Sequence, residues 1–309
     1  MNKYIIKENI SVLGKVVDTF PKGISEAFDQ LAAIIGDNCT FYGICKSEKG
    51  NPIYIAAAEK KMEEEAIKHG YSHYSIECGS YLSTSINGWN TRLPSIKKAF
   101  EELLQNELAD HTKPLIEIYL DQHEMLCLVR TDERKEVLSH FDTTMQDLLA
   151  SLVTFQQDAF NIKPSENRWS AAQVAEHLLK SYQTVSDTLK GPHADTDRYY
   201  NENTEQIKNI FLDFDNKLQS PEFIIPEEML YDQAALLNLL RNTLSDIRSA
   251  FLKTDITKTC TFFTLPVLGH LTCLEWMYFI IYHTQRHIHQ IKNIEESLRT
   301  GNLANVDLT

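Results

Sequence analysis

The pattern of apolar and polar positions changes partway along the chain. Up to about residue 133, short runs rich in β-branched and aromatic residues are interrupted by two stretches with helical periodicity. The expected strands are Ile10–Thr19, Thr40–Cys45, Tyr54–Ala58, Tyr71–Glu77, Gly79–Ser85, Leu115–Leu120 and Glu124–Val129, and the expected helices are Gly23–Ile35 and Leu93–Asn106. This order predicts two strand-helix-strand-strand modules on an antiparallel sheet, an α+β domain over residues 1–133.

From about Asp142 the apolar residues recur at helical spacing. Expected helices contain the stripe Met145, Leu148, Leu149, Leu152 and Phe155, a second run behind Ser170 as N-cap, and the amphipathic runs Ala234–Leu252 and Leu271–Leu298. Between the second and third, a polar stretch from Gly191 to Glu205 precedes Ile207–Leu218, expected as a short helix or loop. The pattern predicts an all-α antiparallel four-helix bundle over residues 142–300, with the charged stretch Thr131–Phe141 as the join.

Composition limits the functions that this chain can have. Its 309 residues fit about two soluble globular domains. No run of eighteen apolar residues occurs, so no membrane partner is expected. The formal net charge of −13 argues against a nucleic-acid partner. No signal sequence is visible at the N-terminus, so a cytoplasmic location is expected. The six cysteines form no Cys-x-x-Cys pair and are interpreted as small buried hydrophobes.

Three histidines are candidates for chemistry. His283 and His287 are four residues apart, so a helix would present both imidazoles on one face, as two ligands of a metal ion; His289 lies on another face. The alternative is that these histidines complement the helix dipole or cap its last carbonyls. His177 lies at the margin of the apolar stripe of the second predicted helix, where it needs either a metal or a hydrogen-bond partner.

The residues that carry this pattern resemble the DinB-like four-helix family over roughly residues 142 to 298. The similar elements are Trp169-Ser170-x-x-x-Val174-x-x-His177-Leu178, Gly269-His270-Leu271-x-x-x-Glu275 and His283-x-x-Arg286-His287-x-x-Gln290-Ile291. The resemblance implies a divalent metal on His177, His283 and His287, most often zinc or nickel. It also implies, for several members, thiol-dependent transferase or hydrolase activity. Arg286 could hold an anionic group beside the metal or form a salt bridge at the surface or bundle end.

The first half resembles the GyrI-like effector-binding family over roughly residues 3 to 131. The similar elements are Phe20-Pro21-x-x-Ile24-x-x-x-Phe28-x-x-Leu31, Tyr42-Gly43-Ile44, Ile53-Tyr54-Ile55-Ala56-Ala57-Ala58, Gly79-x-Tyr81 and Leu115-Ile116-Glu117-Ile118-Tyr119. The resemblance implies a small-molecule cavity with Glu117 at its bottom, lined by Tyr42, Tyr54, Tyr81, Trp89 and Tyr119.

Strand alternation places Leu115, Glu117 and Tyr119 on one face, opposite Ile116 and Ile118. If the two isoleucines pack on the helices, Glu117 faces a concave side with the tyrosines, a setting that suits cationic ligands. An ordinary solvated sheet face is the alternative.

Together these features predict a metal-dependent transferase or hydrolase, directed at thiols or xenobiotics, with an N-terminal module that binds a small molecule. The alternative is a non-catalytic sensor or sequestering protein whose metal site is structural or vacant. No general base is evident, so the catalytic residues are unknown. No basic recognition helix supports a transcription factor. Bundles of this type often dimerise, so a homodimer is a possible assembly.

Overall fold

The computed structural model describes residues 2–36, 38–48, 50–59, 62–89, 93–216 and 218–306, without the side chains of Leu93 and of the residues beyond 300. The predicted domains 1–133 and 142–300 therefore include a few positions outside the described residues: 1, 37, 49, 60–61, 90–92 and 217. The chain divides into two compact units, Met1–Glu136 and Val137–Thr309.

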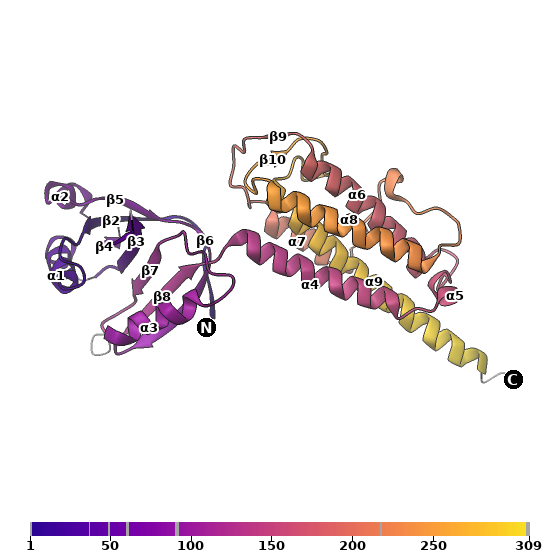
Figure 1. The fold of residues 1–309 in the computed structure, drawn as a ribbon, viewed down its shortest axis with the longest axis horizontal. Coiled ribbons are helices and arrows are strands. Elements are labelled where there is room, and N and C mark those ends of the chain that lie inside the picture. The colour runs from indigo at the N-terminus through magenta and orange to yellow at the C-terminus, as the bar shows by residue number, and fades with distance from the viewer. Residues whose placement is uncertain are drawn as a thin grey trace. The chain divides into compact units, whose positions relative to one another are not determined.

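The N-terminal unit contains a curled antiparallel sheet whose described strands number eight, in the order β1-β6-β8-β7-β3-β4-β2-β5 (Figure 1). The strands are β1 Asn2–Ile6, β2 Ile10–Val16, β3 Phe41–Glu48, β4 Asn51–Glu59, β5 Ser72–Ile76, β6 Gly79–Asn87, β7 Leu115–Tyr119 and β8 Glu124–Arg130. The helices are α1 Ile24–Ile35, α2 Glu63–Lys68 and α3 Leu93–Leu104. All expected strands and helices of this unit are present, and the α+β fold class is confirmed.

Two elements of this unit, β1 and α2, were not predicted. Strand β1 is mostly exposed, pairs with β6, and is too short at five residues to show a clear alternation of apolar and polar positions. Helix α2 is a six-residue helix with three glutamates in its first turn, too short to show an apolar period.

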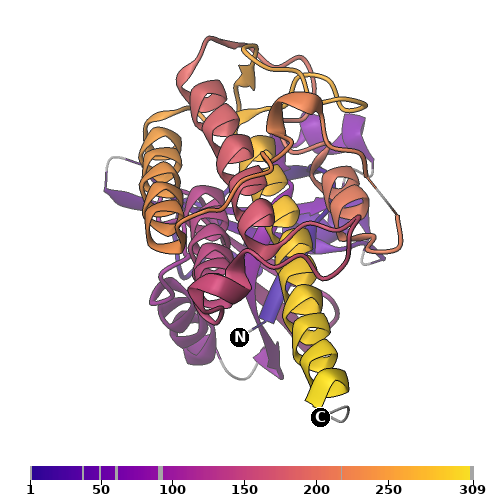
Figure 2. The same ribbon diagram turned by 90° about the vertical axis from the view of Figure 1, so that its right-hand side faces the viewer.

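The C-terminal unit is a helical bundle (Figures 1 and 2). Its helices are α4 Glu133–Val153, α5 Gln157–Phe160, α6 Ala171–Lys190, α7 Thr204–Leu212, the 3-10 turn η2 Glu222–Ile224, α8 Gln233–Lys253 and α9 Cys273–Val306, and a small ribbon joins β9 His193–Ala194 to β10 Thr259–Cys260. The four long helices α4, α6, α8 and α9 are those that the periodicity predicts. Ser170 caps α6 as expected, in a reciprocal capping box with Gln173.

The boundary between the two units, after Glu136, lies within the predicted join Thr131–Phe141, but most of this stretch is helical. Helix α4 begins at Glu133, because the Asp132 carboxylate accepts hydrogen bonds from the backbone of its first turn. Val137, Leu138 and Phe141 are buried in the bundle core at helical spacing. The charged residues around them had obscured this stripe in the sequence.

The two faces of the N-terminal sheet also differ from the expectation. Helix α3 packs on the face that carries Leu115 and Tyr119, whereas Ile116 and Ile118 lie in a separate cluster on the other face. The condition that the isoleucines pack on the helices is therefore wrong, and Glu117 lies on the helix-covered face.

Candidate functional site

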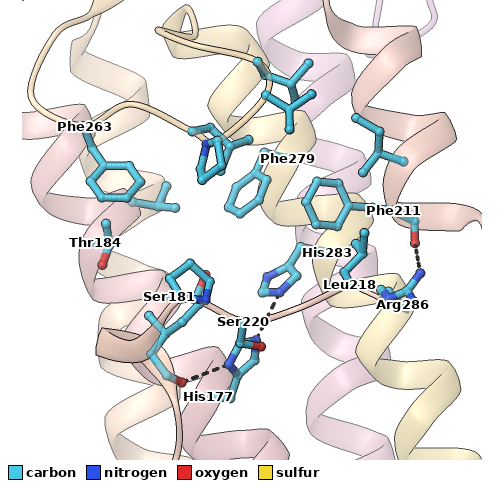
Figure 3. Close-up of a pocket in the computed structure, with 18 of the residues that line it drawn as sticks. His177, Ser181, Thr184, Phe211, Leu218, Ser220, Phe263, Phe279, His283 and Arg286 are labelled. Carbon is cyan, nitrogen blue, oxygen red and sulfur yellow. Dashed lines mark hydrogen bonds between the residues drawn. The ribbon is translucent and has the colours of Figure 1, made fainter. Parts of the chain in front are cut away.

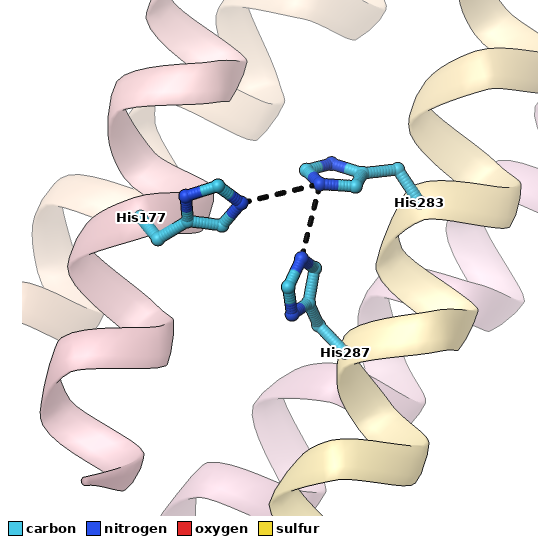
Figure 4. A group of neighbouring side chains, drawn as sticks. All are labelled: His177, His283 and His287. Atoms are coloured by element: carbon cyan, nitrogen blue, oxygen red, sulfur yellow. Dashed lines mark hydrogen bonds between the residues drawn. The ribbon is translucent and has the colours of Figure 1, made fainter. Parts of the chain in front are cut away.

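The three candidate histidines lie together in the bundle. His177 comes from α6, while His283 and His287 come from successive turns of α9, and all three are buried. Figure 4 shows their rings converging. The Nε2 atom of His283 is 3.3 Å from that of His177 and 3.0 Å from that of His287. Nitrogens that share one ion at about 2.0–2.1 Å are about 3.0 Å apart in octahedral and about 3.4 Å apart in tetrahedral geometry, so these spacings suit a metal ion.

Hydrogen bonds fix the tautomers of the two outer histidines. His177 donates from Nδ1 to the Ile224 carbonyl at 3.0 Å, and His287 donates from Nδ1 to the Gln290 Oε1 at 2.8 Å. Each Nε2 therefore presents a lone pair to His283. A single proton on His283 Nε2 cannot form a full hydrogen bond to both of these Nε2 atoms. The Nδ1 atom of His283 is buried without a partner among the described residues. The donor set thus fits a shared cation.

Burial keeps the cluster neutral. Desolvation lowers the pKa of all three histidines, that of His287 to about 3. Repulsion from the neighbouring histidines adds to the effect at His283 and His287. Neutral imidazole is the form that binds metal ions. The lowered pKa values therefore favour the form of these side chains that binds a metal ion.

The cluster opens into a pocket of about 280 Å³. Figure 3 shows His177 and His283 beside it, with Phe211, Phe263 and Phe279 along its wall. The His283 ring stacks on Phe279 at 5.3 Å between centroids. Further apolar lining comes from Val185, Ile210, Leu218, Pro221, Phe223, Ile224, Leu265, Pro266, Val267, Leu268 and Trp276. Sequence reasoning missed this lining, because much of it lies in irregular segments without periodicity.

Arg286 lines the same pocket but makes no salt bridge among the described residues. Its guanidinium donates to the carbonyls of Phe211 at 3.4 Å and Asp213 at 2.7 Å, and also to that of Asn216. The salt-bridge alternative is therefore wrong. Arg286 holds the chain that follows α7 against α9 and so shapes the pocket wall.

The N-terminal candidates divide between the two faces of the sheet. The hydroxyls of Tyr54 and Tyr119 donate to one oxygen of Glu117 at 2.5 and 2.7 Å, and Trp89 packs on Tyr119 at 4.8 Å between centroids. Glu117 is buried, and desolvation raises its pKa. These four residues lie together as expected, and Glu117 is on the helix-covered face of the sheet.

The inclusion of Tyr42 and Tyr81 in that set is wrong. Register pairs Gly43 with Glu117 and Tyr42 with Ile118, so Tyr42 points to the isoleucine face. Tyr81 lies on that face too, in the cluster of Ile116 and Ile118, and donates to the Glu77 carbonyl.

Fold and histidine geometry define the C-terminal unit as a four-helix bundle with a cluster that could bind a metal ion. Residues 140–291 match the family model of the DinB superfamily, whose members often bind metals, so this part of the chain is similar to that superfamily. The uncharacterized protein YuaE of Bacillus subtilis (strain 168) is 26% identical over 164 residues, which are 52% of this chain and 98% of YuaE.

Solved structures give weak likenesses. TT2238, a four-helix bundle protein, is 20% identical with a TM-score of 0.33, over 52% of this chain and 98% of its own. An integron cassette protein from the mobile metagenome of Vibrio cholerae is 12% identical with a TM-score of 0.35, over 42% of this chain and 94% of its own. SAV2435, solved with tetraphenylphosphonium, is 11% identical with a TM-score of 0.33, over 43% of this chain and 94% of its own. Likenesses this weak do not show which ligands this protein binds.

No helix in the described part of the chain is long and apolar enough to cross a membrane.

Proposed function

We propose that the bundle is a metal-dependent transferase that joins a thiol to a small apolar molecule, with zinc or nickel on His177, His283 and His287. The observation that carries the proposal is the convergence of three neutral Nε2 atoms at the wall of an apolar pocket. Three protein ligands leave coordination positions open, which is typical of catalytic rather than structural sites. A divalent ion there would bind a thiol as its thiolate and so supply the nucleophile.

The pocket favours transfer over hydrolysis. Metal-assisted hydrolysis commonly uses a carboxylate as general base, and no Asp or Glu occurs among the described residues that line this pocket. A thiol held by a metal ion there would need no such base, because the ion would favour loss of the thiol proton to solvent. The protein's own groups exclude water through the aromatic wall. The carbonyl of Ile224 and the amide of Gln290 orient His177 and His287, and the Phe279 ring packs against His283.

Pocket size and polarity indicate the partner molecule. A volume of about 280 Å³ is just below the range of about 300–1,000 Å³ for small-molecule sites, so a small substrate fits it best. Trp276 lines the pocket, and its buried indole N–H has no partner among the described residues. It can donate to a single acceptor on an otherwise apolar substrate.

Metal binding can be followed with nickel, which quenches nearby tryptophans. The Trp169 ring lies 5.1 Å from that of His177. We expect saturable quenching in the wild type and in the matched control His289→Ala, an exposed histidine of the same helix, but weaker binding in His287→Ala. Equal nickel affinity in all three proteins would exclude the three-histidine site.

Transfer can be followed as thiol consumption. Cysteine, glutathione and coenzyme A would each be mixed with chlorodinitrobenzene as an apolar electrophile. Zinc- or nickel-loaded protein is expected to accelerate at least one reaction by about 100-fold over the His287→Ala variant, the scale on which a positioned electrophilic group acts. If the zinc- or nickel-loaded protein accelerates none of these reactions, the transferase proposal is wrong and a non-catalytic sensor is the better interpretation.

For the N-terminal unit we propose binding of a small cationic aromatic molecule beside Glu117. What supports this is a buried carboxylate beside the rings of Phe28, Tyr54, Trp89 and Tyr119, a combination that attracts desolvated cations. Thermal shifts with tetraphenylphosphonium as probe should be lost in Glu117→Gln. Shifts that persist in this variant would count against the carboxylate.

A further inference from the structure

A second group of metal-binding side chains lies at the beginning of α9, outside the pocket lining. His193 is on β9, Cys260 is on β10, and Cys273 is the first residue of α9. Their donor atoms lie within 4.8 Å of one another. The cysteines were predicted to be isolated buried hydrophobes, since their spacing along the chain shows no pair.

The backbone brings these three residues together. His193 and Cys260 are directly opposite each other in the β9–β10 ribbon. The amide of Cys260 donates to the Leu271 carbonyl at 2.9 Å, and that of Cys273 donates to the Lys258 carbonyl at 2.9 Å. The arrangement therefore rests on main-chain pairing rather than on flexible side chains.

The separations match the edges of a metal coordination sphere. The two sulfur atoms are 3.4 Å apart, and the Cys273 sulfur is 3.7 Å from the His193 Nε2. For zinc with bonds of about 2.3 Å to sulfur and about 2.0–2.1 Å to nitrogen, tetrahedral edges are about 3.8 Å and about 3.6 Å. A central ion needs only a few tenths of an ångström of adjustment.

We propose that His193, Cys260 and Cys273 form a second metal site, of the thiolate-rich type that binds zinc. Both cysteines are fully buried, so an electrophile of substrate size cannot reach the Cys273 sulfur, and Cys273 does not have the access of a catalytic cysteine. A single ion can enter on the side of His193, which is exposed. The α9 N-terminus favours a thiolate at Cys273. The hydrogen bond between the two cysteines lowers the pKa of Cys273 and raises that of Cys260, so Cys273 would lose its proton first. Metal binding releases the thiol protons.

The site closes a loop of the other pocket. The segment between Cys260 and Cys273 contributes Phe263, Leu265 and Val267 to the pocket beside the histidine cluster. A metal on both cysteines would fasten the two ends of that loop. This inference does not depend on the proposed transferase activity.

Cobalt(II) substitution tests the proposal, because sulfur ligands give a near-ultraviolet charge-transfer band that a site of three histidines lacks. Reduced full-length protein would be titrated with cobalt. The band is expected in the wild type, in His177→Ala/His287→Ala and in the control Cys78→Ser. It should be lost in Cys260→Ser and Cys273→Ser, and His193→Ala should weaken cobalt binding by about tenfold or more.

Three outcomes would overturn the proposal. One is no band in wild-type protein whose thiols are shown to be free. Another is an undiminished band in Cys273→Ser, with folding checked by circular dichroism. The third is a Cys260–Cys273 disulfide in protein isolated without oxygen, which would make the pair a redox bond instead.

Discussion

Replacing Glu275 by Gln should destabilise the bundle strongly. This carboxylate is fully buried and accepts from Arg198 at 2.7 and 2.6 Å, from the Asn203 amide at 2.8 Å and from the Thr272 amide at 2.9 Å. Gln removes the charge and turns one acceptor into a donor that faces other donors. The segment before α7 and the first turn of α9 would both lose an anchor.

Breaking a buried ion pair costs about 3–5 kcal/mol. We take the lower end, about 3 kcal/mol, because the Arg198 side chain is 23% exposed and can regain water. For a domain of this size each kcal/mol lowers Tm by about 2–4 °C, so the expected decrease is about 6–12 °C.

Scanning calorimetry of the full chain measures this decrease, with Glu295→Gln, an exposed residue of the same helix, as the control. A decrease for Glu275→Gln no larger than that of the control would refute the view that this carboxylate anchors the segment.

Three further variants test other features. Gly43→Ala should cost the N-terminal unit about 1–3 kcal/mol, because the methyl group would overlap the Tyr54 hydroxyl and the Glu117 carboxylate; urea unfolding should show it, and no loss relative to the exposed Ser47→Ala would contradict the crowding. Phe141→Ala should cost the bundle about 3–5 kcal/mol by opening a cavity; a calorimetric Tm equal to that of the exposed Ser139→Ala would contradict the packing of Phe141 in the bundle core. Glu117→Gln tests pH dependence, because burial raises the pKa of the Glu117 carboxyl in the folded state above its ordinary value of 4.5. Between these two pKa values the folded state binds more protons than the unfolded state, so the stability of the wild type falls as pH rises, by at most about 1.4 kcal/mol per pH unit. The wild-type stability relative to the variant should follow that fall in urea titrations, and a difference independent of pH would contradict it.

The sequence predicts features whose cause is local. The spacing of His283 and His287 and the capping box at Ser170 depend on residues within one helical turn. The helical position of His177 follows from the apolar stripe around it. These features could therefore be predicted without tertiary information.

Features that depend on distant pairing could not be predicted. Arg198 meets Glu275 across 77 positions, and nothing in either local sequence indicates the other. The resemblance wrongly groups Tyr42 with Glu117, because motifs along the chain do not fix the register of one strand against its neighbour. The charged residues from Glu133 to Glu136 concealed a helix whose apolar stripe starts only at Val137.

Helix α4 determines where the bundle can be cut for separate expression. A fragment that starts at Asp142 would lose Val137, Leu138 and Phe141, and would expose the core surfaces that they cover. A fragment that starts at Asp132 keeps these residues and the carboxylate that caps the helix. The practical boundary of the bundle therefore lies ten residues before the point where its apolar period becomes visible in the sequence.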